Sequence, residues 1–463
     1  MPQPLQLFGT DGIRGRAGVY PLTPETVLRL GQAVAEVFAN QQGSIDEPTL
    51  SDRFNRDWPT VVIGKDTRQS CDMLEAAIAA GLNSRGVDVR LVGVIPTPAV
   101  AMLTKEINAN FGIVISASHN PFHDNGIKFF GPDGYKLPDE MEAAIEARLV
   151  SEESFGEIGK IGRTAPMENA VDRYVHFVCE GVEDHLADGL KIALDTANGA
   201  SFETSEAILK HLGAEVVTFH NRPNGVNINE ECGCTHGEVI EELVRETGAD
   251  VGISHDGDAD RVLLADETGS VLDGDELMAI AGVDLIAQGR LAKDTVVATI
   301  MSNGGLEEAL EKVGGKVVRT GVGDRSVVAE MRRDGLNFGG EQSGHLIFRD
   351  FNTTGDGIVA AVQFLRIMKR REQPLSELRK LMTKFPQAQR NIRVREKLPI
   401  EELKVASDLI TETEATLGSA GRTLVRYSGT EPLLRLLIEG KDSDYIEKQA
   451  DLIAAAIKAQ IGE

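Results

Sequence analysis

Three aspartates alternate with other residues in a short polar segment that follows an apolar stretch. The segment reads HDGDADR, and its carboxylates belong to Asp256, Asp258 and Asp260. In an extended chain, side chains two residues apart point to the same side, so all three carboxylates would face one ligand. Like charges at close range repel unless a cation neutralises them, and oxygen donors suit Mg²⁺ or Ca²⁺. The segment therefore predicts a metal site, with a solvated acidic turn as the alternative.

An EF-hand calcium loop is a rival interpretation of the same aspartates. Glu267 falls at its twelfth position, but its sixth position holds Arg261, where that loop requires glycine. The residues VLLA that follow also predict a strand and not a loop. These two features disfavour an EF-hand.

A serine lies beside a histidine in SASHNP, residues 116–121, which also follows an apolar stretch. Ser118 and His119 could act as a nucleophile and its base. However, adjacent residues seldom hydrogen-bond as a triad does, and the G-x-S-x-G elbow of hydrolases is absent here. A serine-rich turn that stops at Pro121 is an equal alternative. If the aspartates lie nearby, a phosphorylated Ser118 would give the cation a further oxygen ligand, which suggests phosphoryl transfer.

Two other polar segments carry groups that bind phosphates or sugars. RYSGTEP (426–432) combines Arg426 with small residues and hydroxyls, which suits a phosphate cradle. GEQSGH (340–345) places Glu341 and Ser343 two residues apart, so both could face the hydroxyls of a ligand. Each segment is also compatible with an ordinary turn.

Basic residues near glycines offer weaker signals. FGTDGIRG (8–15) is rich in glycine, which permits close backbone approach, and Arg14 could clamp a phosphate. Lys128 follows Ser118 by ten residues. A single lysine is usually exposed, so only its neighbourhood gives it functional interest.

Short β-branched runs alternate with helix-like stretches over most of the chain, which is typical of a mainly parallel α/β fold. One triplet of strands occurs three times, with a helix-like stretch after each first strand. The third strands end in SASHNP, HDGDADR and GEQSGH. Because ligands gather at the carboxyl ends of parallel strands, we expect these segments to meet at one cleft, together with RYSGTEP.

The expected fold class is α/β, with three similar mixed-sheet α/β domains and a smaller C-terminal α+β domain around a central cleft. NIRVRE (391–396) predicts a strand of the last domain, and Ser443–Ile461 has the spacing of an amphipathic helix. Residues 41–58 are polar and aperiodic, which predicts a surface loop insertion. The predicted domains are residues 1–165, 166–275, 276–384 and 385–463.

Composition excludes several classes of function. The chain has 463 residues, and 48 Lys and Arg against 72 Asp and Glu give a formal net charge of −24. Such a charge argues against binding to nucleic acid or to an anionic membrane. We find no run of about 18 apolar residues and no signal peptide, and the four cysteines are too few for a disulfide scaffold, so we expect a cytoplasmic protein. Cys232, Cys234 and His236 lack the spacing and the second pair of a zinc site.

FGTDGIRG, SASHNP, DGDADR, GEQSGH and RYSGTEP occur in the order found in the α-D-phosphohexomutase superfamily, and the chain resembles that superfamily along its whole length. The stretch GEQSGHLIFRDFNTTGDGIVAA (340–361) favours its amino-sugar branch. The resemblance implies four domains, Mg²⁺, and interconversion of glucosamine 6-phosphate and glucosamine 1-phosphate through a phosphoserine and a sugar 1,6-bisphosphate. That reaction would feed UDP-N-acetylglucosamine synthesis.

Two alternatives accompany this interpretation. One is phosphoglucomutase or phosphomannomutase activity on the same scaffold. The other is a catalytically silent protein that binds a phosphosugar or a metal. The silent protein is disfavoured, because a binder needs no phosphorylatable serine beside a metal.

The resemblance also implies roles for individual residues. Ser118 would carry the phosphoryl group, and its phosphate would bind Mg²⁺ together with Asp256, Asp258 and Asp260. A phosphosugar would be the small-molecule partner, and relatives suggest a homodimer. The residues expected to line the reacting centre are Arg14, His119, Lys128 and Arg261. The residues expected to bind substrate are Glu341, Ser343, His345, Arg426, Ser428, Gly429, Thr430 and Arg435.

Overall fold

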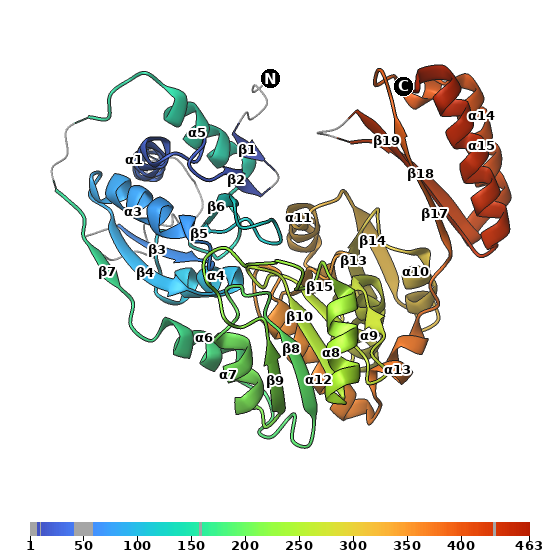
Figure 1. Cartoon of the computed structure of the whole chain (residues 1–463), viewed down its shortest axis with the longest axis horizontal. Helices are drawn as coiled ribbons and strands as arrows, with labels where there is room; N and C mark the ends of the chain where they lie inside the picture. Colours follow the sequence, from blue (N-terminus) through green and yellow to red (C-terminus); the bar gives the residue numbers. More distant parts are fainter. Residues whose placement is uncertain (1–6, 10, 41–58, 157–159, 429–431) are drawn as a thin grey trace. The chain divides into compact units, whose positions relative to one another are not determined.

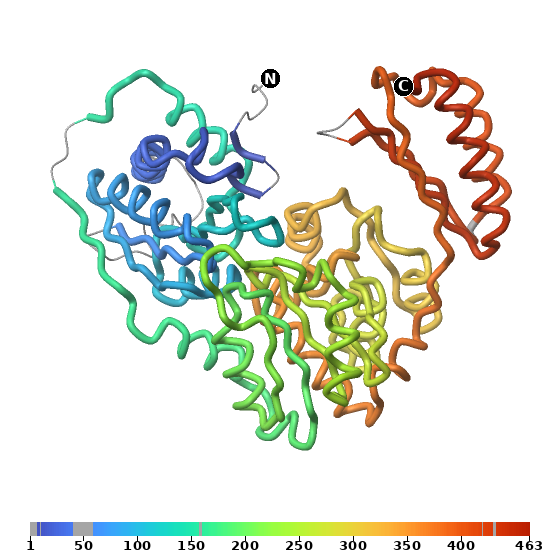
Figure 2. Tube along the Cα trace, viewed as in Figure 1, coloured from blue at the N-terminus to red at the C-terminus, as the bar shows by residue number. Residues whose placement is uncertain are grey.

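The structure is a computed structural model that describes residues 7–9, 11–40, 59–156, 160–428 and 432–463. The loop predicted at 41–58 lies outside these ranges. The chain folds into two compact units, Met1–Met301 with Val318–Lys380 and Ser302–Val317 with Leu381–Glu463. Its trace passes through three α/β sheets in sequence order before it reaches the C-terminal sheet (Figures 1 and 2).

The three α/β sheets repeat one strand order, which confirms the predicted triplication. The first sheet contains the order β6-β5-β3-β4, from β3 (Thr60–Lys65), β4 (Asp88–Val94), β5 (Phe111–Ile115) and β6 (Asp124–Phe130). The second contains β11-β10-β8-β9, from β8 (Lys191–Asp195), β9 (Glu215–Phe219), β10 (Val251–His255) and β11 (Val262–Ala265). The third is β16-β15-β13-β14, from β13 (Thr295–Thr299), β14 (Lys316–Thr320), β15 (Phe338–Gly340) and β16 (Leu346–Phe348).

Each repeat combines a parallel pair with an antiparallel strand, so the sheets are mixed. The first and third strands of each triplet pair in parallel, and the following strand returns antiparallel beside the third. The first sheet is extended by β1 (Phe8–Gly9) and β2 (Gly12–Arg16) at one edge and by β7 (Thr164–Pro166) at the other. The second sheet gains β12 (Val271–Leu272).

Helices follow the first strand of each triplet, as predicted, and these are α3 (Ser70–Asn83), α7 (Thr204–His211) and α10 (Gly304–Glu311). Every residue of β5, β10 and β15 is buried. Strands that are covered on both faces read as continuous apolar runs, which explains why the polar segment after each strand stands out in the sequence. None of the described helices is long and apolar enough to cross a membrane.

Several further helices complete the three α/β repeats. They are α1 (Pro24–Asn40), α4 (Thr97–Glu106), α5 (Asp139–Val150), α6 (Ala170–Cys179), α8 (Gly237–Thr247), α9 (Gly274–Ala287), α11 (Asp324–Asp334), α12 (Gly357–Arg371) and α13 (Leu375–Leu378). Helix α9 begins with a capping box, in which the Asp273 carboxylate accepts from backbone N–H groups of the first turn.

The C-terminal sheet is antiparallel, in the order β17-β19-β18, from β17 (Gln387–Arg393), β18 (Gly421–Tyr427) and β19 (Leu433–Gly440). Helix α14 spans Lys404–Leu417, and α15 spans Ser443–Ile461, the range predicted from its apolar spacing. The strand predicted at 391–396 was placed too late. The partner β19 begins at Leu433, opposite Arg393, so the ladder ends there.

Candidate active site

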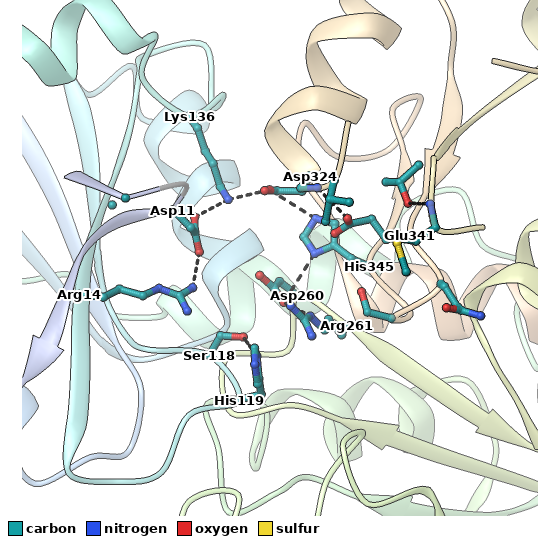
Figure 3. A pocket seen from close by; sticks show the side chains of 18 of the residues that line it. Asp11, Arg14, Ser118, His119, Lys136, Asp260, Arg261, Asp324, Glu341 and His345 are labelled. Carbon is teal, nitrogen blue, oxygen red and sulfur yellow. Dashed lines mark hydrogen bonds and ion pairs between the residues drawn. The ribbon is translucent and has the colours of Figure 1, made fainter. Parts of the chain in front are cut away.

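A pocket of about 610 Å³ lies where the polar loops of the three α/β repeats meet (Figure 3). Each loop follows the third strand of its triplet. The lining residues from these loops include Ser118, His119, Asp260, Arg261, Glu341, Ser343 and His345. The three segments therefore line a single pocket, as expected from their positions at the carboxyl ends of strands.

The loop after β5 is held tightly by the loops after β3, β9 and β10. The Ser118 carbonyl oxygen accepts hydrogen bonds from the Arg68 guanidinium (3.1 Å) and from the Asn229 amide (2.9 Å), and the Ser118 N–H donates to Ser116 Oγ (2.9 Å). A Cβ at Gly257 would lie 2.6 Å from the Ser118 oxygen, so only glycine fits there. These contacts fix a backbone that has left-handed φ at Ser118 (51°).

The Ser118 side chain points at the aspartate cluster. Its Oγ donates to Asp256 Oδ2 at 2.5 Å and lies 3.3 Å from His119 Nδ1. Adjacent residues seldom make such a contact, and here the sharp turn at Ser118 brings the two side chains together. Burial, followed by the positive charges of Arg261 and Arg14, lowers the pKa of His119 to about 4. The imidazole is therefore neutral at pH 7.

Asp256, Asp258 and Asp260 are buried, and one oxygen of each lies within 4.8 Å of the others. The predicted convergence is present, but the extended backbone proposed as its cause is wrong. The segment is a turn, with left-handed φ at Ala259 (56°). The turn brings the three carboxylates close to one another, whereas an extended segment would place them on one side of the chain but farther apart.

The aspartate cluster has the donors of a cation site. Within the described residues, Asp258 Oδ1 and Asp260 Oδ1 are buried and accept no hydrogen bond. Burial and then the charges of Asp260 and Asp258 raise the pKa of the Asp256 carboxyl well above its usual range. Because orphaned buried carboxylate oxygens are costly, this donor set fits a hard divalent cation.

Lys128 lies behind the aspartates and outside the lining of the pocket. Its Nζ is 2.9 Å from Asp258 Oδ2 and 2.9 Å from Asp11 Oδ2, and its side chain is 1% exposed. Burial alone would lower the pKa of Lys128, but the charges of Asp11 and Asp258 raise it overall. Lys128 is therefore a permanent cation next to the candidate metal ligands.

Three charged residues of the pocket lining, Asp11, Lys136 and Asp324, were not predicted as site residues. The Lys136 ammonium pairs with Asp11 Oδ1 (2.5 Å) and with Asp324 Oδ2 (2.6 Å), which links the first repeat to the third (Figure 3). Asp11 lies within FGTDGIRG, so its position in that segment is the signal that could have identified it. No sequence motif around Lys136 or Asp324 indicates a site residue, because the two residues are brought into the pocket by an ion pair between distant segments.

His345 joins the two groups of carboxylates. Its Nδ1 lies 3.6 Å from Asp260 Oδ1, and its Nε2 lies 3.5 Å from Asp324 Oδ2. Burial opposes the charged imidazole, but Asp260 outweighs it and the pKa of His345 rises to about 9. Nearby, Glu341 Oε1 accepts the backbone N–H of Gly323 at 2.9 Å.

Two arginines complete the lining on either side of Ser118 (Figure 3). Arg14 pairs with Asp11 at 2.6 Å. Arg261 Nε lies 3.8 Å from Asp260 Oδ1. The pocket thus presents two guanidinium groups beside the serine, an arrangement that suits an anionic ligand.

The residues predicted in the C-terminal sheet lie in the second compact unit. Arg426 and Arg435 are directly opposite each other on β18 and β19, so their charges are neighbours on one face. The Ser428 carbonyl oxygen accepts from Lys397 Nζ at 2.6 Å. That Arg426, Ser428 and Arg435 bind a ligand of the pocket stays a prediction. Two further predicted residues, Gly429 and Thr430, lie outside the described residues.

Four family models of phosphoglucomutase/phosphomannomutase match successive parts of the chain. Alpha/beta/alpha domain I matches residues 5–155, domain II matches 172–269, domain III matches 273–385, and the C-terminal domain matches 370–456. The family of the matches agrees with the resemblance seen in the sequence.

Curated relatives match at full length. A phosphoglucosamine mutase of Geobacter sp. is 48% identical over 461 residues, which cover 99% of this chain and 98% of the relative. A phosphoglucosamine mutase of Anaeromyxobacter sp. is 49% identical over 465 residues, covering 99% and 96%.

Solved structures share the fold. A phosphoglucomutase/phosphomannomutase family protein from Burkholderia thailandensis is 22% identical with a TM-score of 0.79, covering 99% of both chains. An N-acetylphosphoglucosamine mutase from Aspergillus fumigatus, in complex with GlcNAc-6P and magnesium, is 17% identical with a TM-score of 0.62, covering 98% of this chain and 96% of that one.

Proposed function

Because the chain belongs to the phosphoglucosamine mutase family, we propose that it interconverts glucosamine 6-phosphate and glucosamine 1-phosphate. The observation that carries this proposal is the Ser118 hydroxyl, 2.5 Å from Asp256 in a buried cluster of three aspartates at the wall of a pocket. A serine in this position can carry a phosphoryl group whose charge a cation offsets.

The proposed reaction moves one phosphoryl group in each direction. Phospho-Ser118 loses its phosphoryl group to the free O1 of the sugar, so the bond from phosphorus to Oγ breaks and a bond to O1 forms. The O1 proton leaves to a base of the pocket, and a sugar 1,6-bisphosphate results. After the sugar reorients, Ser118 Oγ takes the phosphoryl group from O6 and O6 regains a proton. The phosphoserine is thus restored.

Mg²⁺ is the proposed cofactor, held by Asp256, Asp258, Asp260 and an oxygen on Ser118. The orphaned oxygens of Asp258 and Asp260 support this assignment. When bound, the cation would offset negative charge on the phosphoryl group. The Lys128 ammonium forms an ion pair with Asp258 Oδ2 and so orients one of the proposed ligands.

The protein's own cations position the phosphorylated sugar. Arg14 and Arg261 lie on either side of Ser118 in the pocket lining, where they can bind oxygens of the transferred group. The neutral His119 beside Ser118 can accept or return the hydroxyl proton. Glu341, Ser343 and His345 are the proposed contacts of the sugar.

The phosphate that does not react would be held by the C-terminal sheet, through Arg426, Ser428, Gly429, Thr430 and Arg435. The placement of Arg426 and Arg435 opposite each other on β18 and β19 supports this proposal. A cytoplasmic location and a homodimer are also proposals. Sedimentation of the purified protein tests the dimer.

Replacing Ser118 with alanine tests the proposal. We expect Ser118→Ala to abolish turnover of glucosamine 6-phosphate when Mg²⁺ and a sugar bisphosphate are supplied. Ser205→Ala is the matched control, because Ser205 is a buried serine in α7 and not in the pocket lining. Undiminished turnover by the Ser118 variant would contradict the phosphoserine, and faster turnover of glucose or mannose phosphates by the unaltered protein would favour the alternative mutase activity.

A further inference from the structure

Asp324 is a pocket carboxylate with unused binding capacity. It is the first residue of α11 and lines the pocket, across from Ser118 (Figure 3). Its Oδ2 lies 2.6 Å from Lys136 Nζ and 3.5 Å from His345 Nε2. Within the described residues, both of these ion pairs are made through Oδ2, and Oδ1 takes part in neither. A carboxylate offers two oxygens with about four acceptor sites, so Asp324 can take another donor.

The other lining carboxylates are already engaged. Asp11 is surrounded by three cations, with Arg14 at 2.6 Å, Lys128 at 2.9 Å and Lys136 at 2.5 Å. Asp260 belongs to the candidate metal cluster.

Glu341 is also partly engaged, since its Oε1 accepts the backbone N–H of Gly323. This contact keeps the Glu341 carboxylate next to the start of α11. Two carboxylates, Glu341 and Asp324, therefore lie side by side on the wall formed by the third repeat. Of these two, Asp324 already pairs with a primary ammonium, that of Lys136.

We infer that Asp324 recognises the protonated amino group of the sugar and makes the pocket prefer an amino sugar phosphate to a neutral hexose phosphate. This inference rests on the proposed function and deepens it. The amine of the sugar carries the same charged donors as the lysine ammonium, and it joins Lys136 on the carboxylate through Oδ1. A neutral hexose presents only a hydroxyl at this position, whose hydrogen bond to a carboxylate lacks the second charge.

The preference should be moderate in size. When a neutral sugar binds, Asp324 keeps its pairing with Lys136 and is not left as an isolated buried charge. The selectivity therefore comes from the single additional contact that the amino sugar makes with Asp324. A hydrogen bond between charged groups corresponds to roughly a 10- to 100-fold effect on kcat/KM.

The test is the ratio of kcat/KM for glucosamine 6-phosphate to that for glucose 6-phosphate, at constant Mg²⁺ and sugar bisphosphate. We expect Asp324→Asn to lower this ratio roughly 10- to 100-fold, because the amide keeps the shape but loses the charge. Asp324→Glu should restore part of it. Asp139→Asn is the matched control. Asp139 on α5 pairs with Arg325, which is the residue after Asp324 on α11, but Asp139 does not line the pocket. Its ratio should equal that of the unaltered protein.

Equal losses on both substrates, or no loss, would overturn the inference, because Asp324 would then only connect the first and third repeats. A second measurement needs no variant. In the unaltered protein the ratio should fall as the pH rises through the pKa of the sugar amine, and a ratio that does not change would also overturn it. If the unaltered protein fails to turn over glucosamine 6-phosphate at all, the proposed function fails. If it turns over that substrate and the ratio stays constant, only the role of Asp324 fails.

Discussion

Two clusters of potential metal ligands lie in the second repeat, and they differ in how their carboxylates are used. One is formed by Asp256, Asp258 and Asp260, and the other by Asp195, His220 and Cys232. In each cluster the ligand atoms lie within 4.8 Å of one another. Proximity alone therefore does not separate a cation site from a structural cluster.

The second cluster is internally satisfied. Asp195 Oδ1 accepts from the Ala197 N–H (2.9 Å) and lies 3.0 Å from His220 Nδ1, while Oδ2 accepts from the Gly233 N–H (2.8 Å). Burial and then the charge of Asp195 raise the pKa of the Cys232 thiol to about 12, so it stays protonated. A protonated thiol is a poor metal ligand.

In the first cluster, by contrast, Asp258 Oδ1 is buried and accepts no hydrogen bond within the described residues. A buried carboxylate oxygen without a hydrogen-bond donor therefore indicates a cation site, whereas short distances between ligand atoms do not. Variants of the two clusters should therefore behave differently.

The largest effect is expected for Asp256→Asn. Replacing this carboxylate ligand of the first cluster by an amide should weaken Mg²⁺ binding and lower kcat by roughly 10²- to 10³-fold, the range seen when a preorganised electrostatic contact is removed. Calorimetric titration with Mg²⁺ and steady-state kinetics measure both quantities. Unchanged Mg²⁺ affinity would place the cation elsewhere.

Asp195→Ala should instead destabilise the fold. Two buried N–H groups would lose their acceptor, which costs about 2–4 kcal/mol of unfolding free energy. Urea denaturation measures this loss. Asp188→Ala is the control, since its side chain is 58% exposed. Mg²⁺ affinity of the folded Asp195 variant should be unaltered, and a loss of affinity would mean that the two clusters act as one site.

Mg²⁺ should stabilise the protein through the first cluster alone. At a concentration one hundred times Kd, we expect about 2.7 kcal/mol of added unfolding free energy. Chelation should reverse this gain, and Asp256→Asn should abolish it. A gain of equal size in the variant would show that the cation binds outside these aspartates.

The smallest effect concerns pH and His220. A hydrogen bond to Asp195 is the main cause that raises the pKa of His220 above its usual 6.5. This pairing therefore stabilises the fold fully below pH 6.5, and the contribution disappears as the pH rises through the raised pKa. Because the side chain is 34% exposed, the contribution should stay below about 1 kcal/mol. The difference in unfolding free energy between the unaltered protein and His220→Gln should shrink between pH 6 and pH 8, and a constant difference would show that the charged imidazole contributes nothing.

Much of the fold could be predicted from the sequence, because its signals are local. Apolar runs such as β5 and β10 are buried on both faces, so the polar loops after them were recognisable as strand ends. The helix at Ser443–Ile461 was also predicted, because its apolar spacing is a property of one segment. The end of β17 was not, because its partner strand decides where pairing stops.

The candidate site was only partly predictable. Ser118 and the three aspartates are recognisable in the sequence by residue type and spacing. The backbone of the aspartate segment was predicted to be extended, but it turns at Ala259. Lys136 and Asp324 were missed, because they are separated by almost two hundred positions and their sequence neighbourhoods carry no sign of the pairing.

The sequence by itself determined which groups are available at the strand ends, since three aspartates occur within five residues directly after an apolar run. The tertiary structure decided which of them are neutralised. Lys128 pairs with Asp258 Oδ2 and Lys136 with Asp324, whereas Asp258 Oδ1 accepts no hydrogen bond within the described residues. The physical reason is that short-range charge pairing requires atoms to be brought within a few ångströms, and between distant segments only packing can do this.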